Sequence, residues 1–306
     1  MRVAIIGGTG FVGRYLTDAL LESGHPVSLL VREGSESKLL HPERVQAVAG
    51  DIGDKESILR LLAGCDAVIY NVGILREVPR KGVTFEATQY EGLVNTVAAA
   101  LELGVQRLLL MSANGVKVPG TRYQETKRRA EEYALKSGLD VTVFRPSVIF
   151  GDPRGSMEFA TQLFNEMVRP PIPAVNFFSG RDPEKGAVVM SPVHIEDVAS
   201  AFRAALEDDA CIGNIYALGG PEALTWKEMI SRIAAAKGRR KWFLSMPIAL
   251  MRGAAKFLDW LPFFPVTRDQ LTMLEEGNVA DPAVVESLIG RAPAAFDSRN
   301  LGYLGS

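Results

Sequence analysis

The sequence predicts an α/β fold in which a doubly wound parallel sheet carries a smaller, mostly C-terminal lobe. The first half of the chain alternates short apolar runs with amphipathic stretches of helical length, which is typical of β–α–β units. Runs such as Val3–Ile6 and Leu108–Met111 are apolar at every position, as expected for strands covered by helices on both faces. After Pro146 this alternation stops, which places the lobe in the second half.

The alternation also predicts the individual elements of the first half. Strands are expected at Arg2–Ile6, Pro26–Val31, Val45–Ala49, Ala67–Asn71, Arg107–Met111 and Asp140–Arg145. Helices are expected between them, at Phe11–Ser23, Lys55–Ala63, Ala87–Leu103 and Tyr123–Lys136. The last two helices are followed by Gly104 and Gly138, a residue type that commonly ends helices.

The second half resumes strand character only briefly. Residues 151–186 are rich in Pro, Gly and Phe and are expected to be loop-rich. Strands are predicted at Ala187–Val193 and Asn214–Leu218, on either side of a helix at Ile195–Glu207. The tail, Thr225–Leu304, is predicted to be helical with several Pro interruptions.

These patterns predict two domains, for which 306 residues are sufficient. The first is expected over residues 1–150 and is re-entered by about 187–219. The second is a smaller substrate or partner lobe formed by residues 151–186 and 220–306.

Composition and charge exclude several classes of function. Lys+Arg 34 against Asp+Glu 36 gives a net charge of −2, so no basic footprint for nucleic acid exists, and Arg239–Lys241 is interpreted as a solvated surface. Two cysteines, Cys65 and Cys211, without a Cys-x-x-Cys motif exclude a disulfide framework, and three scattered histidines offer no metal-ligand spacing. We therefore expect neither nucleic acid nor a bound metal.

The sequence indicates a cytoplasmic protein. It passes from Met1-Arg2 directly into the apolar run Val3–Ile6 and the glycine loop, without the apolar core and cleavage site of a signal peptide. It also lacks a run of about 18 uncharged apolar residues, so a spanning helix is not expected.

A glycine-rich loop lies where the first strand ends and the first helix begins. Gly8, Gly10 and Gly13 match G-x-G-x-x-G, whereas Gly7, Gly10 and Gly13 match G-x-x-G-x-x-G, and both registers remain open. Glycine allows the backbone to approach a pyrophosphate, and the helix N-terminus offers N–H donors. The loop predicts a Rossmann-type dinucleotide site whose contacts come from Gly7, Thr9, Gly10, Phe11, Val12 and Gly13.

The end of the second strand favours NADP(H) over NAD(H). The usual fingerprint places an acidic residue here for the ribose 2′-hydroxyl, but this chain has Arg32 followed by Glu33. A guanidinium matches a 2′-phosphate with two parallel hydrogen bonds. The alternative is that Arg32 is solvated and that Glu33 binds NAD(H).

Tyr123 and Lys127 are four residues apart on one predicted helix and therefore lie on one face. An ammonium beside a phenol stabilises the phenolate and lowers its pKa, so that Tyr123 can exchange a proton with an alcohol or carbonyl oxygen. Ser112 follows the strand that precedes this helix and is expected to hydrogen-bond the same oxygen. The three residues are the candidate catalytic group, although a Tyr/Lys pair at this spacing also arises by chance.

With these motifs in order, the sequence resembles the short-chain dehydrogenase/reductase superfamily in its extended and atypical branch, which includes NAD(P)-dependent epimerases and dehydratases. The resemblance rests on the glycine loop, Asp51-Ile52, Asn71-Val72-Gly73, Ser112, Tyr123/Lys127, Arg145-Pro146-Ser147 and Val193–Val198. Pro265–Leu271 and Glu276–Val279 further resemble bacterial relatives of the nucleotide-binding accessory subunit of respiratory complex I.

The resemblance implies further cofactor contacts. Asp51 and Ile52 are expected to flank the adenine, and Asn71, Val72 and Gly73 to line the ribose side of the cofactor. Lys127 is also expected to hold the nicotinamide ribose, and Ser147 to lie near the carboxamide. Two departures stand out: Asn71-Val72-Gly73 lacks the alanines usual in extended members, and Gln89 stands where many relatives have Asn or His.

Two functions follow from these observations. The first is an NADP(H)-dependent oxidoreductase or epimerase-like enzyme that uses Ser112, Tyr123 and Lys127 on an unknown alcohol or carbonyl. The second is a non-catalytic NADPH-binding accessory or sensor protein of a larger, respiratory-chain-like complex. Aromatic pairs at Phe177-Phe178 and Trp242-Phe243 either line an apolar substrate site or fill the core of the lobe.

The segment Pro247–Leu261 predicts a broadly apolar helix. Arg252, Lys256 and Asp259 form one narrow polar stripe, and apolar residues cover the remaining faces. The helix is expected to pack within the lobe, while the alternative places it, with Phe263-Phe264, on a membrane surface or a partner subunit. We expect at most weak, salt-sensitive membrane contact, and a protein partner or homo-oligomer is left open.

Overall fold

The computed structural model describes residues 1–258 and 268–305, which form two compact units. The first unit consists of residues 1–145 and 198–217, and the second of residues 146–197 and 218–306. The segment 187–219, predicted to re-enter the first domain, is thus divided, since its central part belongs to the first unit and its two ends to the second.

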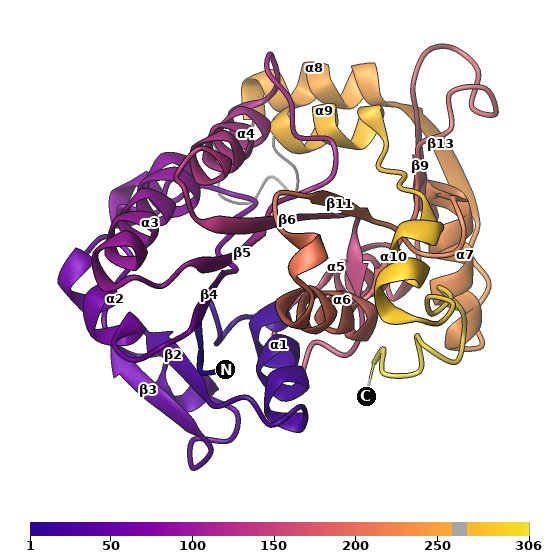
Figure 1. The fold of residues 1–306 in the computed structure, drawn as a ribbon. Coiled ribbons are helices and arrows are strands. Elements are labelled where there is room, and N and C mark those ends of the chain that lie inside the picture. The colour runs from indigo at the N-terminus through magenta and orange to yellow at the C-terminus, as the bar shows by residue number, and fades with distance from the viewer. Residues whose placement is uncertain (259–267, 306) are drawn as a thin grey trace. The chain divides into compact units, whose positions relative to one another are not determined.

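The first unit is built on a seven-stranded sheet with the strand order β11-β6-β5-β4-β1-β2-β3 (Figure 1). The strands are β1 (Val3–Ile6), β2 (Val27–Val31), β3 (Val45–Ala49), β4 (Ala67–Tyr70), β5 (Arg107–Met111), β6 (Asp140–Pro146) and β11 (Ile215–Leu218). Strands β1 to β6 pair in parallel, with Ile6 opposite both Leu30 and Tyr70. Because the order reverses between β1 and β4, a topological switch point lies at their carboxyl ends.

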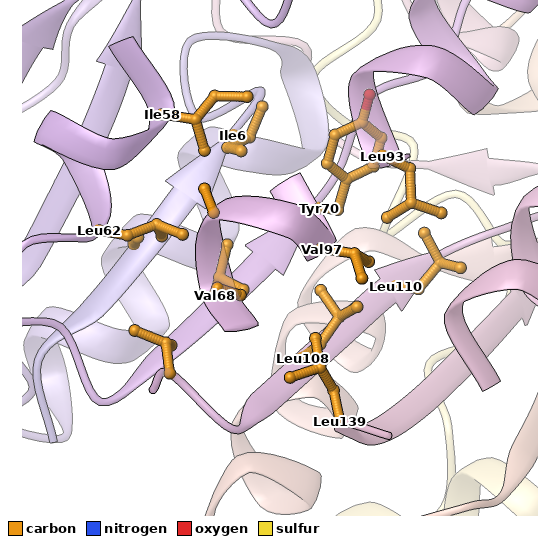
Figure 2. Close-up of a cluster of buried hydrophobic side chains, with 14 of the residues drawn as sticks. Ile6, Ile58, Leu62, Val68, Tyr70, Leu93, Val97, Leu108, Leu110 and Leu139 are labelled. Carbon is orange, nitrogen blue, oxygen red and sulfur yellow. The ribbon is translucent and has the colours of Figure 1, made fainter. Parts of the chain in front are cut away.

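Helices cover both faces of this sheet (Figure 1). One face is covered by α2 (Lys55–Leu62), α3 (Gly92–Leu103) and α4 (Arg122–Leu135), and the other by α1 (Phe11–Glu22) and α6 (Ile195–Glu207). Alternate strand residues such as Ile6, Val68 and Leu108 pack with α2 and α3 in a buried cluster (Figure 2). On the other face Phe144 packs against Phe202, with ring centroids 4.1 Å apart.

The second unit combines short strand pairs with helices around its own core. Its strands are β7 (Ile149–Phe150), β8 (Ala174–Phe178), β9 (Val189–Met190), β10 (Val193–His194), β12 (Leu224–Thr225) and β13 (Phe243–Pro247). Its helices are α5 (Phe159–Leu163), α7 (Trp226–Ala236), α8 (Ile248–Leu258), α9 (Arg268–Glu276) and α10 (Pro282–Ile289). Its buried core includes Phe150, Phe177, Trp226 and Phe296.

Single helical turns and π segments complete the chain. They are η1 (Glu36–Lys38), η2 (Pro79–Lys81), η3 (Glu86–Glu91), η4 (Phe164–Val168) and η5 (Asp209–Cys211). The segment η3 is a π-helix that leads directly into α3, so the helix predicted from Ala87 changes its winding within its first turns. As predicted, α3 ends at Gly104, which has a φ of 71°.

The predicted fold class is confirmed, but the expectation of a helical tail is wrong at β13. Phe243–Pro247 pairs in parallel with β8, a strand far away in the sequence, so local periodicity carried no signal for it. The predicted strand Ala187–Val193 is likewise interrupted and forms the short strands β9 and β10. Among the aromatic pairs, Phe177 and Phe178 are buried, whereas Trp242 is exposed.

The apolar segment after Pro247 forms α8 over Ile248–Leu258. Ile248 is buried, and Arg252 of the predicted polar stripe pairs with Glu275 of α9. The side chains of Lys256 and Asp259, together with Trp260, Leu261, Phe263 and Phe264, lie outside the described residues. In the part of the chain that is described, no helix is both long and apolar enough to cross a membrane.

Candidate functional site

The glycine loop joins β1 to α1 in a shape that requires two of its glycines. Gly7 has a φ of 92°, and a Cβ atom there would lie 2.2 Å from the carbonyl oxygen of Asn71. A Cβ atom at Gly13 would lie 2.2 Å from the carbonyl oxygen of Gly7. At Gly10 the nearest atom would be 3.5 Å away, so this position remains sterically open. The clashes with backbone atoms therefore fall on Gly7 and Gly13, whereas a Cβ atom at Gly8 would meet only the side chain of Leu29, at 2.6 Å.

The N-terminus of α1 is suited to an anion. Gly10 is the N-cap residue and supplies no side-chain cap, and the first turn contains no acidic residue. The first N–H groups of a helix lack intrahelical partners and attract negative charge. Thr9, Phe11 and Val12 are half-buried around this turn. A pyrophosphate would thus meet open backbone donors and no carboxylate.

Residues of the candidate adenosine side follow β2 and β3, the strands next to β1 on one side. Arg32 and Glu33 come directly after β2, are exposed, and form no ion pair with the rest of the described chain. Asp51, after β3, is exposed and accepts a hydrogen bond of 2.9 Å from the Gly53 N–H. Ile52 is half-buried and packs against the core. These side chains follow the carboxyl ends of adjacent parallel strands.

Lys127 ties the ends of two other strands together. Its ammonium donates to the carbonyl oxygen of Val72 at 3.0 Å and to that of Met111 at 2.9 Å, so it links the residues that follow β4 with the end of β5. Gly73 lies beside the ammonium, since a Cβ atom at Gly73 would be 3.6 Å from Nζ. Asn71 contacts the glycine loop through Gly7. The switch point of the sheet therefore brings the glycine loop, Asn71–Gly73 and Lys127 together.

Ser112 is positioned by the same strands. Its N–H donates to the Phe144 carbonyl oxygen at 2.7 Å, and its hydroxyl oxygen is buried without a partner in the described chain. Because Ser112 follows Met111, whose carbonyl oxygen accepts from Lys127, the serine lies next to the lysine contact. A buried hydroxyl without a partner is costly, which favours a ligand at this position.

Tyr123 lies one turn before Lys127 on α4. Thr121 and Gln124 form a reciprocal capping box with hydrogen bonds of 3.3 and 2.8 Å, which begins the helix just before the tyrosine. The Tyr123 ring packs edge-on against Phe85 with a centroid distance of 5.6 Å. The capping box and this ring contact hold Tyr123 on the side of α4 that carries Lys127.

The pKa of Tyr123 differs from the expectation based on the Tyr–Lys pair alone, and the pKa of Lys127 is shifted as well. Burial lowers the pKa of Lys127 to about 8. Burial also raises the pKa of Tyr123 to about 12, whereas the sequence argument expected Lys127 to lower it. The ammonium is directed at two carbonyl oxygens, and the phenol loses hydration. The Tyr123 phenol is therefore protonated near neutral pH.

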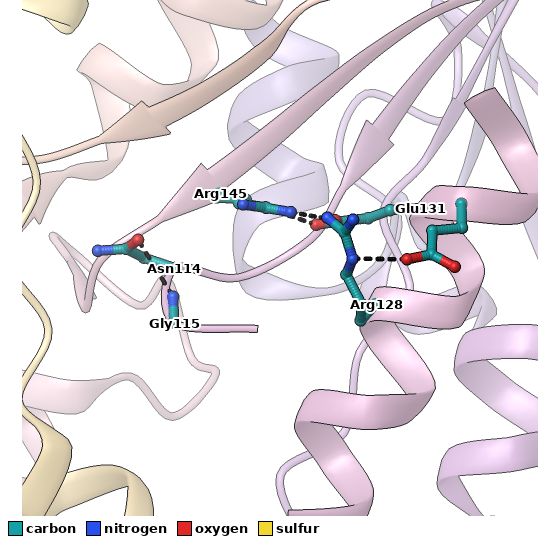
Figure 3. Close-up of polar contacts among 6 residues, drawn as sticks. Asn114, Gly115, Arg128, Glu131 and Arg145 are labelled. Atoms are coloured by element: carbon teal, nitrogen blue, oxygen red, sulfur yellow. Dashed lines mark hydrogen bonds and ion pairs between the residues drawn. The ribbon is translucent and has the colours of Figure 1, made fainter. Parts of the chain in front are cut away.

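Glu131 is a residue of this region that the sequence argument missed. It follows Lys127 by one further turn, is buried, and accepts hydrogen bonds from Arg145, one of them 2.8 Å long (Figure 3). Arg128 approaches the same carboxylate at 3.5 Å. The negative charge of Glu131 raises the pKa of Lys127 and so opposes the effect of burial. The regular spacing of Tyr123, Lys127 and Glu131 was the available signal.

Two other residues noted in the sequence already form hydrogen bonds to carbonyl oxygens of the chain. Ser147 belongs to the second unit, where its hydroxyl donates to the Asn278 carbonyl oxygen at 2.8 Å. Gln89 is buried in the π segment η3, and its amide nitrogen donates to the Ile74 carbonyl oxygen at 3.2 Å. The amide oxygen of Gln89 has no partner among the described residues.

The doubly wound sheet and the glycine loop at its switch point define an α/β protein of the dinucleotide-binding class. Residues 7–169, which are more than half of the chain, match the NAD(P)H-binding family. The chain belongs to this family, and within it to the extended short-chain dehydrogenase/reductase type of oxidoreductase- and epimerase-like proteins. A nicotinamide cofactor follows from this membership.

Individual relatives agree with this assignment. Subunit 9 of the NADH dehydrogenase [ubiquinone] 1 alpha subcomplex of Arabidopsis thaliana is 27% identical over 90% of this chain and 68% of its own length. A 3-beta-hydroxysteroid dehydrogenase of Mycolicibacterium neoaurum is 27% identical over 99% of this chain and 86% of its own. The predicted resemblances to the superfamily and to the complex I subunit are confirmed.

The fold itself recurs in solved structures. The UDP-glucose 4-epimerase of Thermus thermophilus, in complex with NAD, superposes with a TM-score of 0.72 over 99% of this chain and 97% of its own. The sequence identity is 21%, so this likeness concerns the fold alone.

Proposed function

We propose that the protein is an NADP(H)-dependent oxidoreductase that acts on an alcohol or carbonyl through Ser112, Tyr123 and Lys127. The observation that carries this proposal is the buried ammonium of Lys127, held by the carbonyl oxygens of Val72 and Met111 beside the unpartnered hydroxyl of Ser112. Such an arrangement lies where parallel α/β sheets bind their ligands.

The residues present fit the cofactor. The open position at Gly10 and the uncapped N-terminus of α1 suit the pyrophosphate, and exposed Arg32 suits a 2′-phosphate. Asp51 and Ile52 would flank the adenine. An ammonium has three donors, and carbonyl oxygens occupy two of those of Lys127, which leaves one for a ribose hydroxyl. When bound, NADP(H) supplies or accepts a hydride.

Tyr123 would move the proton. Because its pKa is about 12, the phenol is protonated near neutral pH and can donate to the oxygen of a carbonyl substrate as that oxygen becomes an alcohol. Ser112 would hydrogen-bond the same oxygen, and its buried hydroxyl would then gain the partner that it lacks. The positive charge of Lys127 would stabilise the phenolate that forms.

Two loops next to Tyr123 favour a substrate with an apolar part. Leu75 and Val118, on the loops that follow β4 and β5, are large apolar residues with most of their surface exposed. The first loop is joined to α4 because Glu77 pairs with Arg122 at 2.9 Å, and the second leads directly into the first turn of α4. The steroid dehydrogenase relative supports such a substrate.

The proposal is tested with purified protein, NADPH and a series of ketones of increasing alkyl length. We expect the rate of NADPH oxidation to rise with alkyl length. In Tyr123→Phe the rate should fall by about 100-fold or more, while NADPH binding persists. Tyr133→Phe, a tyrosine on the same helix outside the site, is the matched control. Unchanged turnover in Tyr123→Phe would refute the role of the phenol.

The second candidate is a non-catalytic, NADPH-binding accessory or sensor protein. The likeness to a subunit of an NADH dehydrogenase subcomplex favours it, as does the hydroxyl of Ser147, which is already bound to Asn278 within its own unit. A pull-down of respiratory-chain subunits, run beside the ketone assay, separates the two. Capture of such subunits would favour the accessory or sensor protein if the protein also turned over no carbonyl compound with NADPH and no alcohol in the reverse direction.

A further inference from the structure

The second unit carries an exposed tryptophan in a defined surrounding. Trp242 exposes 83% of its surface, although tryptophan is on average a highly buried residue. It directly precedes β13, in which Phe243 packs against the core and Leu244 is 57% exposed. Because side chains alternate along a strand, Trp242 and Leu244 lie on the same side. Two apolar side chains therefore face solvent together.

A third apolar residue lies beside them. The N–H of Ala174 donates to the Trp242 carbonyl oxygen at 2.8 Å, and the Lys241 ammonium donates to the Ile172 carbonyl oxygen at 2.7 Å. These bonds place Ile172, which is 63% exposed, next to the start of β13. Side chains of this kind, gathered on one surface, mark a site of interaction rather than isolated exposure.

Cations border the three apolar side chains. Arg239 donates to the Arg169 carbonyl oxygen at 3.2 Å, which brings both arginines to the segment that leads to Ile172. Arg169, Arg239 and Arg240 are exposed, and none of them pairs with a carboxylate within residues 1–258 and 268–305. We define the Trp242 patch as Ile172, Trp242, Leu244, Arg169, Arg239 and Arg240.

We propose that the Trp242 patch docks the protein on an anionic membrane surface. Tryptophan and aliphatic side chains enter the boundary between headgroups and acyl chains, and arginines pair with anionic headgroups. The chain as a whole carries a net charge of −2, so this attraction is a property of the patch and not of the protein. Arg239 and Arg240, which belong to a cluster interpreted from the sequence as a solvated surface, thereby gain a function.

The size of the patch favours a bilayer over a protein partner. A stable protein interface involves about 20–30 residues on each side, with a fully buried apolar centre. Three apolar side chains do not form such a centre, but they suffice for a shallow insertion supported by charge. Each arginine adds about fivefold to the affinity for an anionic surface, and salt screens this contribution. The binding is therefore reversible and sensitive to ionic strength.

The test is co-sedimentation of the full-length protein with two kinds of vesicle. One kind contains phosphatidylcholine alone, and the other equal parts of phosphatidylcholine and phosphatidylglycerol. We expect binding to the anionic vesicles at low salt, release at high salt, and a blue shift of tryptophan fluorescence that Trp242→Phe abolishes. No binding to anionic vesicles, or equal binding to both kinds, would refute the proposal.

Matched variants distinguish the contribution of the Trp242 patch to membrane binding from that of the net charge of the protein. Arg239→Glu combined with Arg240→Glu should weaken binding at least 25-fold, and Trp242→Ala about 10-fold. Arg181→Glu combined with Lys185→Glu changes the net charge equally at exposed positions outside the patch and should have little effect. Equal loss in both double variants would overturn the proposal, as would a wild-type dimer that Trp242→Ala converts to a monomer. Circular dichroism verifies that each variant is folded.

Discussion

Glu131 lies one helical turn beyond Lys127 on α4, and both side chains are buried. Arg145, from β6, holds the Glu131 carboxylate with two hydrogen bonds (Figure 3). Two opposing effects therefore act on the lysine, since burial lowers its pKa to about 8 and the charge of Glu131 raises it. The ion pair between α4 and β6 is thus coupled to the protonation state of the candidate catalytic lysine.

Glu131→Gln should shift the pH dependence of the protein. The substitution keeps the shape of the side chain and removes the charge that supports the ammonium, so the pKa of Lys127 should fall below about 8. We expect the alkaline limb of NADPH binding and of turnover to move to lower pH by roughly one unit. Glu132→Gln, on the same helix and half-exposed, is the control. Identical profiles for wild type and Glu131→Gln would show that Glu131 acts only through packing.

Lys127 also predicts how the free energy of unfolding varies with pH. Its pKa is about 8 in the folded protein and 10.5 ordinarily, so between these values the unfolded chain binds more protons. The free energy of unfolding should therefore rise with pH across this interval, by on the order of 3 kcal/mol. Below about pH 8 the ammonium is buried in its charged form, and the full cost of burying it lowers the stability. Urea unfolding of wild type and Lys127→Met at several pH values measures this, because the variant should lose the rise. Parallel curves would contradict it.

The glycine loop predicts opposite results at two positions. Gly10 has a φ of −80° and room for a Cβ atom, so Gly10→Val should keep a wild-type melting temperature while its branched side chain blocks the pyrophosphate and abolishes NADPH binding. Gly13→Ala should instead lose about 2 kcal/mol or more of stability, because its Cβ atom would lie 2.2 Å from the Gly7 carbonyl oxygen. Thermal unfolding and fluorescence titration with NADPH distinguish them. Tight NADPH binding by Gly10→Val would place the pyrophosphate elsewhere.

Sequence patterns predicted those parts of the fold that depend on neighbouring residues. Apolar runs such as Val3–Ile6 become buried strands because every side chain is covered, and the glycine loop is specified by the backbone freedom of its own residues. The i and i+4 spacing likewise placed Tyr123 and Lys127 on one helix face.

Features that depend on distant segments were not predictable in this way. β13 becomes a strand because β8 offers it hydrogen bonds, and Arg145 reaches Glu131 from another element. The direction of the Tyr123 pKa shift was also missed, since burial depends on how Phe85, at the start of η3, packs against α4. Packing between residues that are distant in sequence determines such strand pairings, ion pairs and pKa shifts, and the periodicity of the sequence does not predict it.

Arg32 predicts the preference between the two nicotinamide cofactors. It is exposed after β2 without an ion pair in the described chain, so its guanidinium can bind a 2′-phosphate without breaking an existing contact. Arg32→Ala should weaken NADPH binding by about 1.5–3 kcal/mol and leave NADH binding almost unchanged. Glu33→Gln should not weaken NADPH binding, because the substitution removes a carboxylate that would repel the 2′-phosphate. Each variant is titrated with both cofactors. Equal losses of NADH and NADPH affinity in Arg32→Ala would remove Arg32 from this role. A selective loss of NADH affinity in Glu33→Gln would favour Glu33 as the ribose ligand of an NAD(H)-dependent protein.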